Sequence, residues 1–453
     1  METIIIIVFL VGYLAITLEH NLKIDKLIPA LAMMALLWAL IALAHMPVFE
    51  VNTDLKELEA THLDEILLHH LGKTAEILVF LLGAMTIVEI IDYFDGFATI
   101  KGYIKTKSKR KLLWLFAGLS FILSAIIDNL TATIVLVTIL QKVIKDRETR
   151  LWFAGLIIIG ANAGGAWSPI GDVTTTMLWI ANKVSAAQLI EHVLIPSIVC
   201  LAVPVLAASR YKVFQGNFEG DLEDEVPKSK FGGTMLYLGL GAIIFVPFFK
   251  TITHLPPYVG MMLSLAIVAT FAEIYSNAKF SISSVDEDSE EASHHSPVHK
   301  SLSKIELPSI LFFLGILLAV AALESLGMLF HFAEYLDTTM PALGTESRLE
   351  VVSDLVVLIL GVASAIIDNV PLVAASMGMF SVPIDDPVWH FIAYSAGTGG
   401  SMLIIGSAAG VVAMGMEKID FFWYLRKISW LAFLGFIGGS AAFIIMRNLV
   451  LNV

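Results

Sequence analysis

Long apolar segments separated by short polar ones make up most of this chain of 453 residues. A helix of roughly 20 mostly apolar residues spans the hydrocarbon core of a bilayer. By that criterion we predict an all-α, multi-pass membrane protein with ten spanning helices. They lie near 3–18, 27–46, 75–94, 151–181, 189–209, 232–250, 256–275, 308–330, 390–415 and 428–449.

Two further apolar stretches, 112–140 and 352–381, each carry an Asp-Asn pair in the middle. Clusters of Lys and Arg flank 112–140 on both sides, and basic residues concentrate in cytoplasmic loops. Both ends of 112–140 are therefore expected on the cytoplasmic side. The flanks of 352–381 are poor in basic residues. We predict two re-entrant helical hairpins, one entering from each side of the membrane.

The distribution of basic residues supports this topology along the whole chain. With the N-terminus outside, 22 of the 28 Lys and Arg residues fall in loops assigned to the cytoplasm. Treating either Asp-Asn stretch as a full span would move basic groups to the other side. Ten crossings also place the C-terminus outside, on the same side as the N-terminus.

An internal repeat divides the chain into halves. The hexapeptide SAIIDN occurs at 124–129 and at 364–369, and a glycine-rich interruption of the next span follows each copy, at 161–172 and 396–407. Gly164, Gly165 and Gly171 correspond to Gly399, Gly400 and Gly406. Each half has five crossings, and an odd number inverts the second half relative to the first, as in many secondary transporters.

The predicted organisation follows from this repeat. The first repeat, 1–209, contains the hairpin 112–140 and a broken helix at 151–181. The second, inverted repeat, 232–453, contains the hairpin 352–381 and a broken helix at 390–415. A cytoplasmic linker at 210–231 joins them.

Composition and charge exclude several classes of function. Hydrophobic residues make up 57% of the chain and charged residues 15%, and the net charge is −13. No basic run interleaved with aromatic residues suggests a nucleic-acid partner. The single cysteine, Cys200, excludes Cys-based zinc sites, and no cofactor motif is present. An enzyme is disfavoured because the short loops offer no nucleophile, base and orienting group together.

Asp128 and Asp368, at the two hairpin tips, are the principal candidates for function. An ionised Asp in the hydrocarbon region is costly unless it faces water, an ion or a polar partner. Each tip also offers an amide oxygen, from Asn129 or Asn369, and free carbonyls at helix ends. Hard oxygen donors suit Na⁺ or Li⁺. A helix-capping role for the two Asp residues is the structural alternative.

Further polar residues lie near the tips and the glycine breaks and are candidate ligands. Asp172 is less certain than the tip residues because its repeat partner is Ser407, and the hydroxyl groups could equally serve helix packing. Three acidic residues near span ends are candidates for proton movement or simply reach interfacial water. The ligand candidates are Thr131, Thr133, Asn162, Ser168, Asp172, Ser395, Thr398, Ser401 and Ser407, and the proton candidates are Glu89, Asp92 and Glu324.

The carboxylates also predict the class of substrate. A pair of Asp residues at the centre repels anions, whereas a cation and H⁺ compete for a deprotonated carboxylate. Competition for one site, combined with alternating access, is sufficient to exchange Na⁺ for H⁺. Such transport falls at low pH, where the carboxyl groups stay protonated.

SAIIDN at both tips, followed by GGAWSPIGD and GGSMLIIGS, resembles the NhaD-type sodium/proton antiporters of the ion transporter superfamily over nearly the whole chain. The resemblance implies a homodimer with a scaffold domain and a moving transport domain that works as an elevator. It implies a bacterial inner-membrane exporter of Na⁺ and Li⁺ driven by inward H⁺, with periplasmic termini. It would place both hairpins and both broken helices in the transport domain, and the first, second and last spans of each half in the scaffold.

Other functions of the superfamily remain open. Sodium-coupled dicarboxylate symporters resemble this chain but have Ser-Asn-Thr at the hairpin tips, where this chain has Asp-Asn-Leu and Asp-Asn-Val. An arsenite permease is harder to exclude by charge, since arsenous acid is neutral. A channel lined by the polar hairpins is a further alternative.

Overall fold

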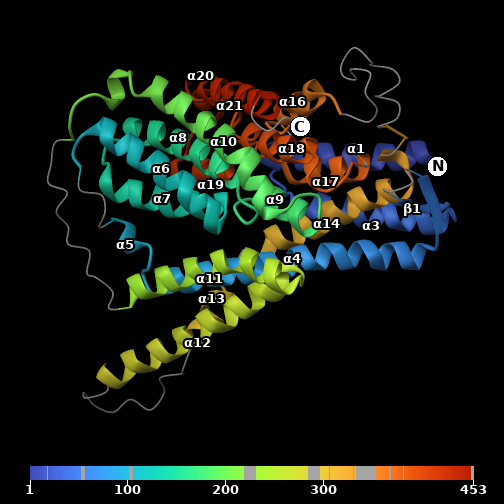
Figure 1. Ribbon diagram of the computed structural model, residues 1–453, viewed down its shortest axis with the longest axis horizontal. Helices are drawn as coiled ribbons and strands as arrows, with labels where there is room; N and C mark the ends of the chain where they lie inside the picture. The colour runs from blue at the N-terminus through green and yellow to red at the C-terminus, as the bar shows by residue number, and fades with distance from the viewer. Residues whose placement is uncertain are drawn as a thin grey trace.

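The computed structural model describes most of the chain. The described residues are 1–17, 19–52, 57–101, 106–218, 231–283, 296–305, 307–329, 331–332, 352–366, 369–380 and 382–449. They are mostly helical (Figure 1). Asp368 and most of the acidic stretch near 285–301 lie outside the described residues.

Most helices of the first half follow the predicted segments, but α4 begins at Leu63, twelve residues before the predicted start at 75. The predicted span at 151–181 is divided in two, α8 and α9, by residues 167–172. The stretch 112–140 forms two helices, α6 and α7, separated by Asp128 alone. The elements are α1 (Glu2–Thr17), α2 (Glu19–Leu22), α3 (Leu27–Leu43), α4 (Leu63–Tyr93), α5 (Ala98–Lys101), α6 (Lys109–Ile127), α7 (Asn129–Val143), α8 (Arg147–Ala166), α9 (Val173–Ile180), α10 (Ala186–Ala208) and the 3-10 turn η1 (Lys212–Phe214).

The second half has the same order of helices. The predicted span at 390–415 is divided into α18 and α19, and 352–381 forms the helices α16 and α17. The elements are α11 (Gly232–Thr253), α12 (Pro257–Ser283), α13 (Pro297–Leu302), α14 (Leu307–Ser325), α16 (Asp354–Ala363), α17 (Asn369–Met379), α18 (Pro387–Gly399), α19 (Ala408–Glu417), α20 (Phe421–Lys427) and α21 (Ser429–Leu449).

Seven of the described helices are long and apolar enough to cross a bilayer, so the chain is a multi-pass membrane protein. They are α4, α6, α10, α11, α12, α14 and α21. The helix α6 is one of them, although its sequence predicted a hairpin limb. The count of ten crossings stays a prediction.

The expectation of an all-α protein was wrong in one place. Val48–Asn52 (β1) and Glu57–Thr61 (β2) pair antiparallel, with Val48 opposite Thr61. Both segments alternate apolar and polar residues in part, a pattern that favours a strand. They were overlooked because they fall in a polar connection between two predicted spans.

The helices gather into two bodies according to their mutual packing. In Figure 1, α4, α11, α12 and α13 of the first body lie below α6, α8 and α10 of the second. We call the first the scaffold body; it consists of α1, α3, α4, α11, α12, α13 and α14. We call the second the site body; it consists of α6 to α10 and α16 to α21. Helices that pack most extensively on one another share a body, as α14 does with α3 and α6 with α8.

The last span of each half, α10 or α21, does not pack in the scaffold as the resemblance implied. These two helices pack on each other and on the broken helices α8 and α18. Small residues permit this close approach, because a Cβ atom on Gly435 of α21 would lie 3.1 Å from Cδ of Pro204 in α10. Both helices therefore belong to the site body.

The pair α6–α7 and the pair α16–α17 begin at opposite ends of the site body. At the start of α6, the amide of Lys109 donates to the Gly216 carbonyl at 3.1 Å, beyond the end of α10. At the start of α16, the carboxylate of Asp354 accepts two bonds of 2.6 Å from Arg447, near the end of α21. Each pair extends from its own end toward the middle of the bundle.

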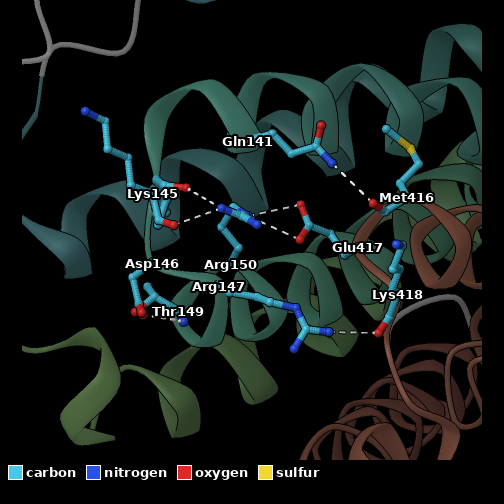
Figure 2. Close-up of polar contacts among 10 residues, drawn as sticks. Gln141, Lys145, Asp146, Arg147, Thr149, Arg150, Met416, Glu417 and Lys418 are labelled. Carbon is cyan, nitrogen blue, oxygen red and sulfur yellow. Dashed lines mark hydrogen bonds and ion pairs between the residues drawn. The ribbon is translucent and has the colours of Figure 1, made fainter.

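A partly buried ion pair joins the residues between α7 and α8 to the end of α19 (Figure 2). Arg150 donates from Nε to both carboxylate oxygens of Glu417, each at 3.2 Å, and from Nη1 to the carbonyls of Ile144 and Lys145. The Glu417 side chain is only 1% exposed. The end of α7, the start of α8 and the end of α19 are thereby held together.

Asp146 caps α8 in the same region. Its carboxylate accepts from the Thr149 amide at 2.8 Å, and hydrogen bonds from Thr149 hold the pKa of Asp146 below its usual value. The carboxylate is therefore ionised at neutral pH, where its negative charge at the helix N-terminus is favourable.

Candidate functional site

The glycines of the two broken helices let the backbone of each helix pair, α6–α7 or α16–α17, approach the broken helix that follows it in the chain. A Cβ atom on Gly171 would lie 2.9 Å from the Cα atoms of both Ala125 and Gly165. In the second half, a Cβ atom on Gly406 would lie 2.8 Å from the Cα of Ala365 and 2.8 Å from the Gly400 carbonyl oxygen. Only glycine fits at such distances. The glycines that interrupt each broken helix therefore also serve as contact points.

Hydrogen bonds at equivalent positions join each helix pair to its broken helix. The hydroxyl of Ser124 in α6 donates to the Ala161 carbonyl at 2.5 Å. The hydroxyl of Ser364, just after α16, donates to the Ala396 carbonyl at 2.7 Å. Both serines belong to the SAIIDN motif, so the motif anchors the turn against the broken helix.

Asp172 and Ser407 begin the second segment of each broken helix. The Asp172 carboxylate accepts from the Thr174 amide at 3.0 Å, and the Ser407 hydroxyl accepts from the Gly410 amide at 3.2 Å. Both residues are N-caps with extended backbone, and each is 2% exposed. A carboxylate in the first half therefore takes the place of a hydroxyl in the second.

Asp172 lies where the two turns meet. Asn129, at the start of α7, donates from Nδ2 to Oδ2 of Asp172 at 2.8 Å. Asn369, at the start of α17, donates from Nδ2 to the same oxygen at 3.3 Å. Asn129 and Asn369 are both buried. One buried carboxylate thus accepts a hydrogen bond from an asparagine of each repeat. Asp172 had been the less certain candidate because the equivalent residue of the second repeat is Ser407.

Asn162 extends this network to the second broken helix. Its Oδ1 accepts from Asn129 Nδ2 at 3.0 Å, and its Nδ2 donates to the hydroxyls of Ser401 and Ser407, each at 2.9 Å. Asn162 is fully buried. Five predicted ligands therefore join Asp172 in one polar cluster: Asn129, Asn162, Asn369, Ser401 and Ser407.

Asp128 forms the turn between α6 and α7 and caps α7. Its carboxylate accepts from the Thr131 amide at 2.8 Å and from the Thr131 hydroxyl at 2.9 Å. Its φ of +87° and ψ of 159° fall in a region that only glycine adopts without strain. Such strain costs about 1–3 kcal/mol and is typical of functional sites. Asp128 thus caps α7, which is the structural role considered as the alternative to ion binding. It also lies beside the polar cluster, because it lines the same cavity as Asp172.

The remaining ligand candidates are buried but separate from Asp172. The hydroxyls of Thr133 and Ser395 have no hydrogen-bond partner within the described parts of the chain. Ser168 donates to the Ala125 carbonyl at 2.5 Å and Thr398 to the Tyr394 carbonyl at 2.6 Å. Hydroxyls bonded to helix carbonyls in this way serve packing.

The three proton-movement candidates lie elsewhere. Asp92 is exposed near the end of α4, where Lys304 lies 3.8 Å from its Oδ2. Glu89 and Glu324 are half-buried in α4 and α14. The cavity described next is lined by other residues of the described chain.

A cavity of about 80 Å³ separates the polar cluster from the scaffold body. The site body contributes two carboxylates, Asp128 and Asp172, to the wall. The scaffold body contributes mainly apolar side chains, with Lys26 and Ser309 as polar exceptions. Sequence reasoning missed Lys26 and Ser309. Lys26 precedes one apolar segment and Ser309 lies near the start of another, and the order of apolar and polar residues does not show that either side chain lines a cavity.

The cluster has the chemistry of a cation site. Carboxylate, amide and hydroxyl oxygens are the donors that Na⁺ prefers. The asparagines direct NH₂ groups at Asp172, and rotation of an amide by half a turn would direct its oxygen there instead. The amide hydrogen bonds stabilise an ionised Asp172 but, being neutral, leave its charge uncancelled.

Several known proteins of similar sequence or structure are named as transporters. A family model described as citrate transporter, CitMHS, matches residues 3–389. Sodium/proton antiporter 1 of Arabidopsis thaliana is 42% identical over 98% of this chain and 72% of its own length. The Na(+)/H(+) antiporter NhaD of Vibrio cholerae is 29% identical over 94% of this chain and 87% of its own.

A solved structure shows the same fold. The YdaH transporter of Alcanivorax borkumensis, described as having an unusual topology, matches with a TM-score of 0.57. It is 12% identical in sequence, and the match covers 93% of this chain and 96% of that one. The resemblance to NhaD-type antiporters stated from the SAIIDN motifs is confirmed.

Proposed function

The chain belongs to the citrate transporter family described above, and we propose that it is a secondary active antiporter that exports Na⁺, and also Li⁺, in exchange for H⁺. Relatives named sodium/proton antiporters support this activity. The observation that carries the proposal is Asp172, a buried carboxylate that accepts from Asn129 and Asn369 beside a cavity.

Exchange arises because Na⁺ and H⁺ compete for the same carboxylates. A deprotonated carboxylate in a buried site is stabilised by a bound cation, whereas a protonated one is neutral and needs none. We propose Asp128 and Asp172 as exchanging groups, together with Asp368, which lies outside the described residues. The neutral ligands are Asn129, Asn162 and Asn369.

We further propose that the site body moves as an elevator against the scaffold body. The glycine contacts and the Arg150–Glu417 pair make the site body internally tight. The wall that faces it is mostly apolar, with Phe80 and Phe312 among its side chains. Apolar surfaces can slide without breaking polar contacts. The moving element would carry both helix pairs as re-entrant hairpins.

The membrane arrangement is part of the same proposal. Ten crossings with both termini on the periplasmic side follow from the distribution of basic residues. The resemblance supports a homodimer in a cell inner membrane. No resident cofactor is needed, because Na⁺, Li⁺ and H⁺ are the cargo.

A sodium-coupled carboxylate symporter is the second candidate. It is favoured by the description of the family and by Lys26, a cationic group on the cavity wall. Against it, the two carboxylates in the same wall repel an anion. Uptake of labelled citrate driven by a Na⁺ gradient in proteoliposomes distinguishes the two candidates.

Dequenching of a pH-sensitive dye in everted vesicles, on addition of Na⁺ or Li⁺ at alkaline pH, tests the antiport proposal. Asp172→Asn and Asp128→Asn keep the helix cap, because Asn caps as well as Asp, and remove the titrating group. Both variants should be silent. Asp420→Asn, at the exposed cap of α20, is the matched control and should respond normally. Exchange at the normal rate in both site variants would overturn the proposal.

A further inference from the structure

Lys250, on α11, joins the scaffold body to the site body through its ammonium group. Its Nζ donates to the Trp179 carbonyl at 2.9 Å and to Oδ1 of Asn182 at 3.2 Å, at the end of α9 and just beyond it. The same ammonium lies 4.8 Å from the centre of the Trp179 ring. Lys250 is half-buried, and Trp179 is 2% exposed. One lysine therefore makes both polar and aromatic contacts across the boundary between the two bodies.

This contact is made on the helix that begins at Asp172. Asp172 is the N-cap of α9, and the Trp179 carbonyl lies in its last turn. Because an α-helix rises 1.5 Å per residue, the eight residues of α9 extend only about 12 Å. A cation beside the last carbonyls of a helix is also favoured by the helix dipole. Lys250 thus holds one end of a short helix whose other end carries Asp172.

The equivalent helix of the second repeat, α19, is held in a different way. Arg147, at the start of α8, donates to the Lys418 carbonyl just beyond the end of α19 at 3.1 Å. Both α8 and α19 belong to the site body. The end of α19 is therefore bound within its own body, whereas the end of α9 is bound to the scaffold body.

We propose that Lys250 is a latch, which holds the site body in the conformation of this structure and must release Trp179 and Asn182 before Asp172 can move relative to the scaffold body. The inference rests on the proposed antiport by movement of the site body. The cavity wall is mostly apolar, but this contact is a charge-assisted hydrogen bond, which is stronger than a neutral one. Its loss therefore opposes the movement and favours the latched conformation.

In the predicted topology, the latch lies on the external side of the membrane. Loops 182–188 and 251–255, next to Trp179 and Lys250, fall on that side. Lys26 and Ser309, which line the cavity, lie at the starts of α3 and α14, on the cytoplasmic side. The latched conformation thus closes the external side and leaves the carboxylates to be reached from the cytoplasm.

The distance between spin labels on the two bodies measures the latched fraction. Cys200→Ser removes the single native thiol, and Gly72→Cys on α4 and Glu191→Cys on α10 supply the labelled positions. Both positions are exposed, and a side chain at Gly72 meets open space. Double electron–electron resonance on the purified full chain then gives the ratio of latched to released molecules.

Lys250→Met keeps an unbranched apolar side chain and removes the ammonium. The ratio of latched to released molecules should fall by about tenfold, a value at the lower end for a charged hydrogen bond because Lys250 is partly exposed. Lys250→Arg keeps a donor and a cation over the ring and should retain the wild-type ratio. Lys111→Met removes the same charge from an exposed position on α6, and should also leave the ratio unchanged.

A thiol at the boundary detects the released form when it is rare. Ile243, on α11, lines the cavity and is 1% exposed. The rate at which a maleimide labels Ile243→Cys, in the Cys200→Ser background, is proportional to the fraction of molecules in which the bodies separate. Lys250→Met should raise this rate by the same factor of about ten.

Asn182 tests whether the two hydrogen bonds form one contact. Its φ is +53°, which glycine adopts freely, so Asn182→Gly removes the amide oxygen without straining the backbone. The variant should lower the ratio by less than Lys250→Met, since the Trp179 carbonyl remains. In the Lys250→Met background it should have little further effect. Fully additive effects would count against the latch.

The outcomes separate the latch from the antiport. If the wild type exchanges Na⁺ for H⁺ and Asp172→Asn is silent, but Lys250→Met matches Lys111→Met in distance ratio and labelling rate, only the latch fails. Lower thermal stability of Lys250→Met with both readouts unmoved indicates a purely structural lysine and also overturns it. If the wild type does not exchange, the antiport proposal fails, while the distances still decide whether Lys250 holds the two bodies together.

Discussion

Ser407 occupies in the second repeat the position that Asp172 occupies in the first. Their backbone angles agree within 3°, at φ −148° and ψ 150° for Asp172 and φ −149° and ψ 153° for Ser407. Both cap a helix that follows a glycine break. The two repeats thus share a backbone but differ in chemistry, so the site is asymmetric in charge.

This relationship predicts unequal effects of substitution at the two positions. Asp172→Ser keeps a capping group, as Ser407 shows, and removes the carboxylate that Asn129 and Asn369 contact. We expect Na⁺-dependent exchange in everted vesicles to fall by at least about tenfold. Ser407→Ala removes one partner of Asn162 and a cap worth about 1 kcal/mol, and should retain measurable exchange. Equal loss in the two variants would contradict an asymmetric site.

The sequence predicted the features that depend on local pattern. Apolar length located the helices, and the glycines at 164, 165 and 171 located the break between α8 and α9. The repeated Asp-Asn pair located the turn at Asp128. Each of these follows from a few consecutive residues.

Features that depend on packing between distant helices were beyond sequence reasoning. The assignment of α10 and α21 to the site body rests on contacts such as that of Gly435 with Pro204. Lys26 reaches the cavity only because α3 packs beside α14. Asp172 was underestimated because comparison of the repeats matched it with a serine, while its position between the two turns is a property of the fold.

The glycine contacts predict a sharp difference between two Gly→Ala variants. In Gly171→Ala, the new methyl group would lie 2.9 Å from the Ala125 and Gly165 Cα atoms, so the turn must shift away from the broken helix. We expect exchange to be lost and thermal stability in detergent to fall. Gly118→Ala, in α6, has open space around the new methyl group and should be neutral or slightly stabilising. Normal exchange in Gly171→Ala would show that close approach at this point is dispensable.

The Arg150–Glu417 pair predicts which arginine near the start of α8 contributes most to the stability of the protein. Arg150→Met leaves the Glu417 carboxylate buried and unpaired, which typically costs about 3–5 kcal/mol. Thermal unfolding of the purified protein in detergent should show a large loss of stability, and Arg150→Met combined with Glu417→Gln should recover most of it. Arg147→Met removes an exposed side chain that donates to the Lys418 carbonyl at 3.1 Å, and should cost little. Equal losses in Arg150→Met and Arg147→Met would mean that the buried pair does not hold α8 to α19.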